Sequence, residues 1–324
     1  MQITKTFAAL VVLGALCSAS LTRAADDFPS RSIRIVVAYS AGGGNDLVAR
    51  LLAARLSEQF GKTVFVENRA GASGIVGTEL VAKSPPDGYT LILSDAPHVI
   101  NPYVYPSVQY DPVKDFEPVT LVATAPVVLA VYAKAPYQSL GDFIAAAKKD
   151  PNKITMGSGG TGTVSHVAGE LFQLRAGIKL VHVPYKGNGP AIVDLIGGQI
   201  SVMLGSISSL YPHATAKKLR LLGVASVKRS PAAPEIPTIA EGGLPGFEVN
   251  GWNCLVAPRA TPPQVIKRLN AEIVAGFNQS DVVERLRKQS IDPATGTPEQ
   301  LASYMKSEIA RYSKLIKAVG LTTD

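Results

Sequence analysis

Two glycine-rich loops decide how this sequence is expected to fold, Tyr39-Ser-Ala-Gly-Gly-Gly-Asn-Asp46 and Gly157-Ser-Gly-Gly-Thr-Gly-Thr-Val-Ser-His166. Each closes a short β-branched stretch typical of a strand and opens a helical pattern. Glycine lets the backbone turn sharply and approach a ligand closely. The first N–H groups of a helix have no partner within the helix, and they favour negative charge. The two loops therefore predict an anion held between two lobes.

The first loop lies in an alternating pattern of strands and helices. Buried strands are predicted at 33–39, 63–67 and 90–94 because these runs are apolar and short. Helices are predicted between them, at 47–60 and 71–82. This βαβαβ order predicts a parallel sheet with helices on both faces.

The pattern then restarts around the second loop. The apolar run 121–133 is interpreted as a strand that passes from one unit into another, and Ser139 with Asp142 predicts a capped helix that ends at Lys149. Further strands are predicted at 153–157, 180–185, 200–204 and 219–225, with helices at 164–175 and 190–196. A second α/β sheet is therefore expected within 127–244.

The last part of the chain is expected to return to the first sheet. A strand is predicted at 247–258, and it is followed by helices at 262–277, 282–288 and 298–319 that have no sheet of their own. The expected fold class is α/β, with lobe 1 made of 25–126 and 245–324 and lobe 2 made of 127–244. Crossings near Thr124 and Gly251 would form a hinge between the lobes.

The first 24 residues have the features of a secretory signal peptide. Lys5 precedes an apolar run at 7–16, and Thr22-Arg23-Ala24 ends in a small residue, so cleavage is predicted after Ala24. The apolar run is too short for a resident transmembrane helix. The mature protein, from residue 25, is expected in the periplasm or outside the cell.

The composition of the mature chain limits its partners. Loss of Lys5 and Arg23 leaves 30 basic and 25 acidic residues, a net charge of +5. Mild basicity without a Lys/Arg cluster argues against a nucleic-acid groove and suits an anionic small molecule. Cys254 is the single cysteine outside the signal peptide, so no intramolecular disulfide is expected.

The second loop admits more than one interpretation. Gly157-x-Gly159-x-x-Gly162 matches a dinucleotide fingerprint between a strand and a helix, but the next strand ends in Val183-Pro-Tyr-Lys186 rather than in an acidic residue. The glycines could also serve only to start a helix. A carboxylate cradle is the interpretation that we favour. In the third loop, Tyr185-Lys-Gly-Asn-Gly-Pro190, a plain turn and a selective wall of the site remain equally open.

Catalytic interpretations have weaker support. Ser165 and His166 are adjacent, so on a helix they would point about 100° apart and form no nucleophile and base pair by themselves. The four histidines lack the spacing of metal ligands, and Cys254 is expected to be a buried, inert thiol. Asn45 and Asp46 are predicted to cap a helix rather than to bind an anion. An exported α/β hydrolase remains the alternative function.

Six motifs, taken in order, carry a resemblance to a known family. They are Val37-Ala-Tyr-Ser-Ala-Gly-Gly-Gly-Asn-Asp46, Val66-Glu-Asn-Arg-Ala-Gly-Ala-Ser-Gly74, Pro86-Asp-Gly-Tyr-Thr-Leu91, Gly157-Ser-Gly-Gly-Thr-Gly-Thr163, Val183-Pro-Tyr-Lys-Gly187 and Pro245-Gly-Phe-Glu-Val249. Together they resemble the Bug-type extracytoplasmic receptors of tripartite tricarboxylate transporters, over essentially the whole mature chain.

The resemblance implies a two-lobed periplasmic-binding-protein fold of type II, no catalysis, no cofactor and no metal. It also implies that a small carboxylate is bound between the lobes, and that membrane permease subunits are partners of a monomeric receptor. Carried over to this chain, the binding residues are Tyr39, Gly42, Gly43, Ser94, Asp95, Ser158, Gly159, Gly160, Thr161, Gly162, Thr163, Tyr185, Lys186, Gly187 and Asn188.

Overall fold

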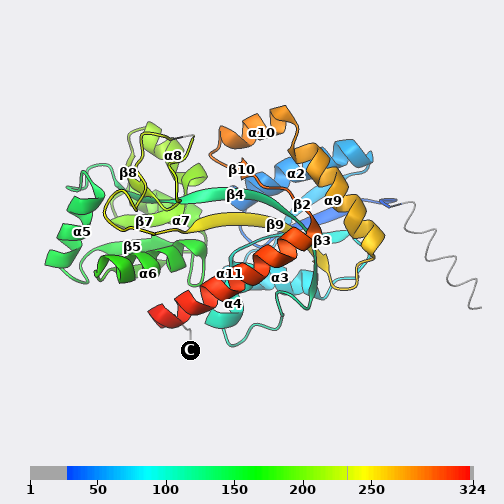
Figure 1. Ribbon diagram of the computed structural model, residues 1–324, viewed down its shortest axis with the longest axis horizontal. Coiled ribbons are helices and arrows are strands. Elements are labelled where there is room, and N and C mark those ends of the chain that lie inside the picture. Colours follow the sequence, from blue (N-terminus) through cyan, green and yellow to red (C-terminus); the bar gives the residue numbers. More distant parts are fainter. Residues whose placement is uncertain (1–27, 232, 322–324) are drawn as a thin grey trace, which may run out of the picture.

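The computed structural model describes residues 28–231 and 233–321, and the predicted signal peptide lies outside them. Two lobes, each built on its own part of a curled mixed sheet, lie end to end (Figure 1). Two long strands, β4 (Phe116–Tyr132) and β9 (Asn250–Pro258), connect them. The predicted α/β class with two lobes is confirmed. No helix in the described ranges is long and apolar enough to cross a membrane.

The sheet of the first lobe begins with three parallel strands, as the βαβαβ pattern predicts. These are β1 (Ile33–Val37), β2 (Val64–Asn68) and β3 (Thr90–Asp95). The strand order is β2-β1-β3-β9-β4, with the short β10 (Asp292–Pro293) on β4. The predicted parallel pairing of these three strands is confirmed. The returning strand β9, whose direction was not predicted, runs antiparallel to both β3 and β4.

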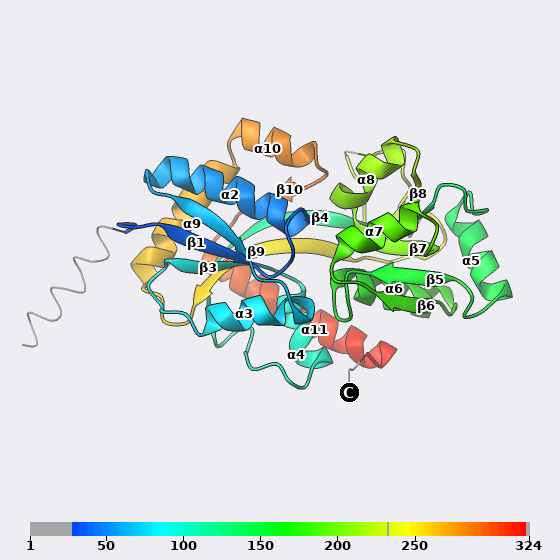
Figure 2. The same ribbon diagram turned by 180° about the vertical axis from the view of Figure 1, so that it is seen from behind.

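Helices cover both faces of the first sheet (Figure 2). One face carries α2 (Gly44–Phe60), α9 (Pro263–Phe277) and α10 (Ser280–Arg287), which share a buried core with β1 and β3. The other face carries the short η1 (Ala72–Gly74), α3 (Ile75–Ala82), α4 (Pro97–Val104) and α11 (Pro298–Val319). The C-terminal helices therefore pack on the first sheet, as predicted.

The second lobe has the strand order β6-β5-β7-β4-β8, with the far half of β4 inside it. Its other strands are β5 (Thr155–Ser158), β6 (Val181–Pro184), β7 (Val202–Ser206) and β8 (Leu219–Val224). Its helices are α5 (Leu140–Lys149), α6 (Val164–Ala176), α7 (Asn188–Ile196) and α8 (Ile207–Thr215). Ser139 and Asp142 form the predicted capping box of α5.

Two short helices escaped the sequence analysis. Helix α4 begins at Pro97 and contains Pro102, and α8 contains Pro212. A proline removes a helical hydrogen bond and crowds the preceding turn, so proline inside a short segment reads as loop. Both helices directly follow strands that end at the junction of the lobes. Two helices that lie next to the site are therefore missing from the sequence analysis.

The lobes are joined where β4 and β9 pair beside each other. Ala125 lies opposite Gly251, and Thr124 lies opposite Trp252. A Cβ on Gly251 would come within 3.1 Å of the Ala125 carbonyl oxygen, so the close pairing of the crossing strands favours glycine. The Trp252 indole donates a hydrogen bond of 2.8 Å to Glu308 of α11. The crossing is thereby tied to the C-terminal helix.

Candidate functional site

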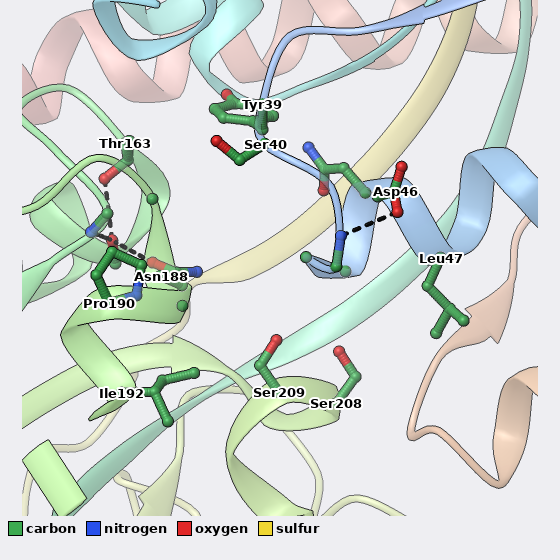
Figure 3. Close-up of a pocket in the computed structure, with 18 of the residues that line it drawn as sticks. Tyr39, Ser40, Asp46, Leu47, Thr163, Asn188, Pro190, Ile192, Ser208 and Ser209 are labelled. Atoms are coloured by element: carbon green, nitrogen blue, oxygen red, sulfur yellow. Dashed lines mark hydrogen bonds between the residues drawn. The ribbon is translucent and has the colours of Figure 1, made fainter. Parts of the chain in front are cut away.

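A cavity of about 580 Å³ lies between the lobes. Its walls are the loops and first turns of α2, α6, α7 and α8, so four strand-to-helix connections converge on it. Figure 3 shows Ser208 and Ser209 of α8 on the side of the cavity opposite Tyr39 and Ser40. A smaller pocket of about 100 Å³ adjoins it towards the crossing strands and includes Asn253.

The start of α2 offers backbone N–H groups to this cavity. Gly43 is the N-cap residue, and the first N–H groups of the helix after it have no partner within the helix. The Gly42 N–H is different, because it donates to Asp46 Oδ2 at 3.0 Å (Figure 3). Asp46 therefore holds the turn just ahead of the helix, and it does not cap the first N–H groups of α2 as predicted. Gly42 lines the cavity without a free N–H group.

The negative charge of the Asp46 carboxylate is balanced by its hydrogen-bond partners. It accepts hydrogen bonds from Arg50 Nε at 2.9 Å and Asn68 Nδ2 at 3.0 Å. Burial alone would raise the pKa of Asp46, but the hydrogen bonds from Arg50, Gly42 and Asn68 outweigh burial and lower it. The charge of Asp46 is thus balanced inside the first lobe.

A second carboxylate, Asp95 at the end of β3, faces the cavity. Tyr39 OH donates to its Oδ1 and Asn45 Nδ2 donates to its Oδ2, each at 2.9 Å. Asn45 is held in turn by Asn253 Nδ2 at 3.0 Å, so Asn45 does not cap α2. Burial raises the pKa of Asp95 to about 6, although the two donors oppose that shift.

The second glycine loop uses its own N–H groups in hydrogen bonds to neighbouring side chains. The N–H groups of Gly159, Gly160 and Gly162 donate to Ser165 Oγ at 2.9 Å, Ser158 Oγ at 3.2 Å and His166 Nδ1 at 3.2 Å. These N–H groups are therefore bound within the loop and its helix. The picture of a cradle of free amides, which follows from the glycine pattern alone, does not describe this loop.

The tip of the same loop contacts the first lobe. The Thr161 carbonyl accepts hydrogen bonds from Ser73 Oγ at 2.6 Å and Tyr105 OH at 2.7 Å. Gly162 lies against the same surface, since a Cβ on it would come within 3.2 Å of Asn101 Oδ1 and of the Tyr105 ring. The tip of the loop thus forms a contact between the lobes.

The third loop supplies a wall of the cavity. Lys186, Gly187 and Asn188 line it, and Asn188 begins α7. Tyr185 turns away, because its hydroxyl donates to Asp194 at 2.7 Å. Of the two interpretations of this loop, a selective wall suits Lys186 and Asn188, and a structural role suits Tyr185.

The structure divides the expected binding residues into two groups. Those that line the cavity are Tyr39, Gly42, Gly43, Asp95, Gly159, Thr163, Lys186, Gly187 and Asn188. Those outside its lining are Ser94, Ser158, Gly160, Thr161, Gly162 and Tyr185. Lining residues that the sequence analysis missed include Ser208 and Ser209, because α8 itself was missed.

The candidate catalytic residues do not form a catalytic unit. His166 uses Nδ1 to accept the Gly162 N–H, and its Nε2 lies 3.6 Å from Glu170. Ser165 Oγ instead contacts Thr163 Oγ1 at 2.9 Å. Burial raises the pKa of the Cys254 thiol, as expected for an inert cysteine. Within the described ranges, no group of three His, Cys, Asp or Glu side chains could hold a metal ion.

Two stacked histidines, His166 and His182, contact the second loop. The rings of His166 and His182 lie 3.8 Å apart at an interplanar angle of 12°. His182 Nε2 lies 2.6 Å from Ser158 Oγ, the group that binds the Gly160 N–H. Burial first, and the nearby His166 second, lower the pKa of His182 to about 4.

This pKa predicts a loss of stability in acid. Between pH 6.5 and pH 4 the unfolded chain binds a proton at His182 that the folded chain does not bind, so stability falls as the pH falls through that window. The loss at pH 5 is expected to reach up to about 2 kcal/mol. Urea unfolding at pH 7 and pH 5 should show a smaller loss for His182→Gln than for the wild type. Equal losses in the two proteins would contradict the prediction.

Comparisons with known proteins agree with this architecture. Protein BugT of Bordetella pertussis (strain Tohama I) is 36% identical over 322 residues, which cover 99% of each chain. The structure of Rpa4515 of R. palustris with adipate has a TM-score of 0.88 and 36% identity, and the match covers 90% of this chain and 98% of that one. MatC of Rhodopseudomonas palustris, with bound malate, has a TM-score of 0.85 and 33% identity, over 89% of this chain and 100% of that one.

A family model described as the tripartite tricarboxylate transporter family receptor, TctC, matches residues 48–321. Together with BugT, this match confirms the Bug-type resemblance of the motifs. It describes a receptor rather than an enzyme, and nothing in the comparisons supports the hydrolase alternative. The chain therefore belongs to the TctC family, the receptors of tripartite tricarboxylate transporters.

Proposed function

We propose that this receptor binds a small organic carboxylate in the cavity between its lobes. The observation that carries the proposal is the first turn of α2, whose N–H groups have no partner within the helix and which lines that cavity. Adipate and malate, bound by Rpa4515 and MatC, are both carboxylates, which supports the same ligand class here.

The donors around the cavity are sufficient for useful affinity. A micromolar dissociation constant corresponds to about 8 kcal/mol. Each hydrogen bond to a charged group contributes about 1.5–3 kcal/mol, part of which offsets the cost of association. The start of α2, the hydroxyls of Ser208 and Ser209, and the amide of Asn188 would together supply enough donors, with Lys186 adding positive charge at the rim.

The ligand would then be delivered to permease subunits in the membrane. The signal peptide predicted at 1–24 and membership of this receptor family support a periplasmic location. We further propose that the receptor acts as a monomer and that 127–244 moves as one lobe against 25–126 and 245–324. The two crossing strands would be the hinge.

A thermal-shift screen over organic acids tests the ligand class. A ligand at 100 times its dissociation constant should stabilise the protein by about 2.7 kcal/mol, which raises the melting temperature by several degrees. Dicarboxylates, hydroxy acids and amino acids should be compared with their amides, which lack the charge. A panel in which amides stabilise as well as the acids would contradict recognition of a carboxylate.

A further inference from the structure

Asp95 is a hydrogen-bond acceptor in the wall of the cavity. Tyr39 OH occupies one of its oxygens and Asn45 Nδ2 the other. A carboxylate has about four lone-pair sites, so two donors leave acceptor capacity free. Asp95 lines both the main cavity and the smaller pocket beside it. The free capacity is therefore available to a bound molecule.

The charge of Asp95 has no ion-pair partner among the residues that the structure describes. No ion pair within 28–231 and 233–321 includes Asp95, whereas the other cavity carboxylate, Asp46, is paired with Arg50. The pKa of Asp95 is raised to about 6 by burial, and at pH 7.5 the group is still largely ionised. An unpaired, half-buried charge is a costly arrangement unless a ligand supplies the opposite charge.

Asp95 also lies close to the proposed carboxylate site. Asn45 belongs to the first turn of α2, and its side chain reaches Asp95 at 2.9 Å. One asparagine side chain and one hydrogen bond therefore connect the Asn45 backbone, in the first turn of α2, to Asp95. A ligand with an anionic group and a cationic group a few bonds apart can contact both. A ligand that is only anionic would bring a second negative charge towards Asp95.

We propose that Asp95 selects ligands that carry a protonated amine beside the carboxylate, so that this receptor prefers amino carboxylates. The inference rests on the proposed function and deepens it. The carboxylate of the ligand would accept from the first turn of α2, and its ammonium group would donate to Asp95. The ammonium group would supply the positive partner that Asp95 lacks among the described residues.

Two matched series of ligands test this preference by calorimetry at pH 7.5. Aspartate, malate and succinate share a four-carbon diacid skeleton and carry an amine, a hydroxyl and neither. Glutamate, 2-hydroxyglutarate and glutarate repeat the series with five carbons. In the wild type, the amine member is expected to bind at least fivefold more tightly than the unsubstituted acid, with the hydroxy acid between them.

Two variants assign the preference to Asp95. Asp95→Asn and Asp95→Ser remove the negative charge, and each should reduce the amine preference to less than twofold. Asp95→Ser is included because an amide at this position could place its N–H group against Asn45. The matched control is Asp194→Asn, which removes another aspartate that accepts from a tyrosine hydroxyl but lies outside the cavity lining. It should retain the full preference.

The outcomes separate this proposal from the proposed function. Equal binding of all three members of a series would overturn the role of Asp95 and leave the carboxylate receptor standing. A preference that survives in both Asp95 variants, or tighter binding of the hydroxy acid than of the amino acid, would also overturn it. Failure of every carboxylate in the wider screen would overturn the proposed function itself.

Discussion

Replacing Gly43 by valine is expected to lower the affinity for a carboxylate ligand at least thirtyfold, about 2 kcal/mol, while the fold remains intact. Gly43 has φ −82° and ψ 172°, an extended conformation that any residue adopts. A Cβ there would meet only the Ser40 carbonyl oxygen, at 3.9 Å. The added side chain therefore fits the protein, but it stands at the start of α2, where the ligand must approach the N–H groups.

Calorimetry with the best ligand of the screen, together with a melting curve, checks this prediction. The matched control is Gly141→Val, in the first turn of α5, where a Cβ would lie 3.7 Å from Ser139 Oγ and far from the cavity. The control should bind like the wild type. Wild-type affinity in Gly43→Val would show that the start of α2 is not the anion site.

The corresponding change in the second loop would be a poorer test. Gly160 has φ +125°, a conformation that side chains rarely adopt, and a Cβ would lie 3.2 Å from the Tyr185 carbonyl oxygen. Valine there would strain the backbone wherever the ligand binds. The two glycine-rich loops look alike in sequence, but the N–H groups of Gly159, Gly160 and Gly162 in the second loop are already hydrogen-bonded within that loop and its helix.

Much of the fold could be predicted from periodicity and loop chemistry. The β-branched runs predicted strands, and the helical pattern at 47–60 predicted most of α2. Ser139 with Asp142 predicted the capped start of α5. The passage of β4 between lobes was visible as one long apolar run. The direction of β9 was not predictable in this way, because strand direction depends on how the chain returns from the other lobe.

The site was predicted less completely, since glycine spacing does not show where N–H groups find partners. Ser165 and His166 are unremarkable in a sequence, but they bind the N–H groups of Gly159 and Gly162. The role of Thr161 depends on Ser73 and Tyr105, which are distant in the chain. Helix α8, which brings Ser208 and Ser209 to the cavity, was not predicted because Pro212 is typical of a loop. Tertiary contacts of this kind leave no local pattern.

Removing the contact between the lobes is expected to have the second large effect. In the double variant Ser73→Ala with Tyr105→Phe, the Thr161 carbonyl loses both of its hydroxyl donors. A carbonyl left unpaired inside a protein costs about 1–3 kcal/mol. Thr161 is half-buried, so opening the lobes would return its carbonyl to water. Ligand affinity should therefore fall about tenfold, because part of the binding free energy would be spent on closing the lobes.

Small-angle scattering distinguishes this effect from a simple loss of stability. Without ligand, the double variant should have a larger radius of gyration than the wild type, and saturating ligand should restore the wild-type value. Ser84→Ala is the matched control, because its hydroxyl donates to the Leu80 carbonyl within one lobe at 2.8 Å. If the double variant melted earlier but kept the wild-type radius and affinity, Thr161 would be a fixed anchor. Any hinge movement about β4 and β9 would then occur with the contact between Thr161 and the first lobe still formed.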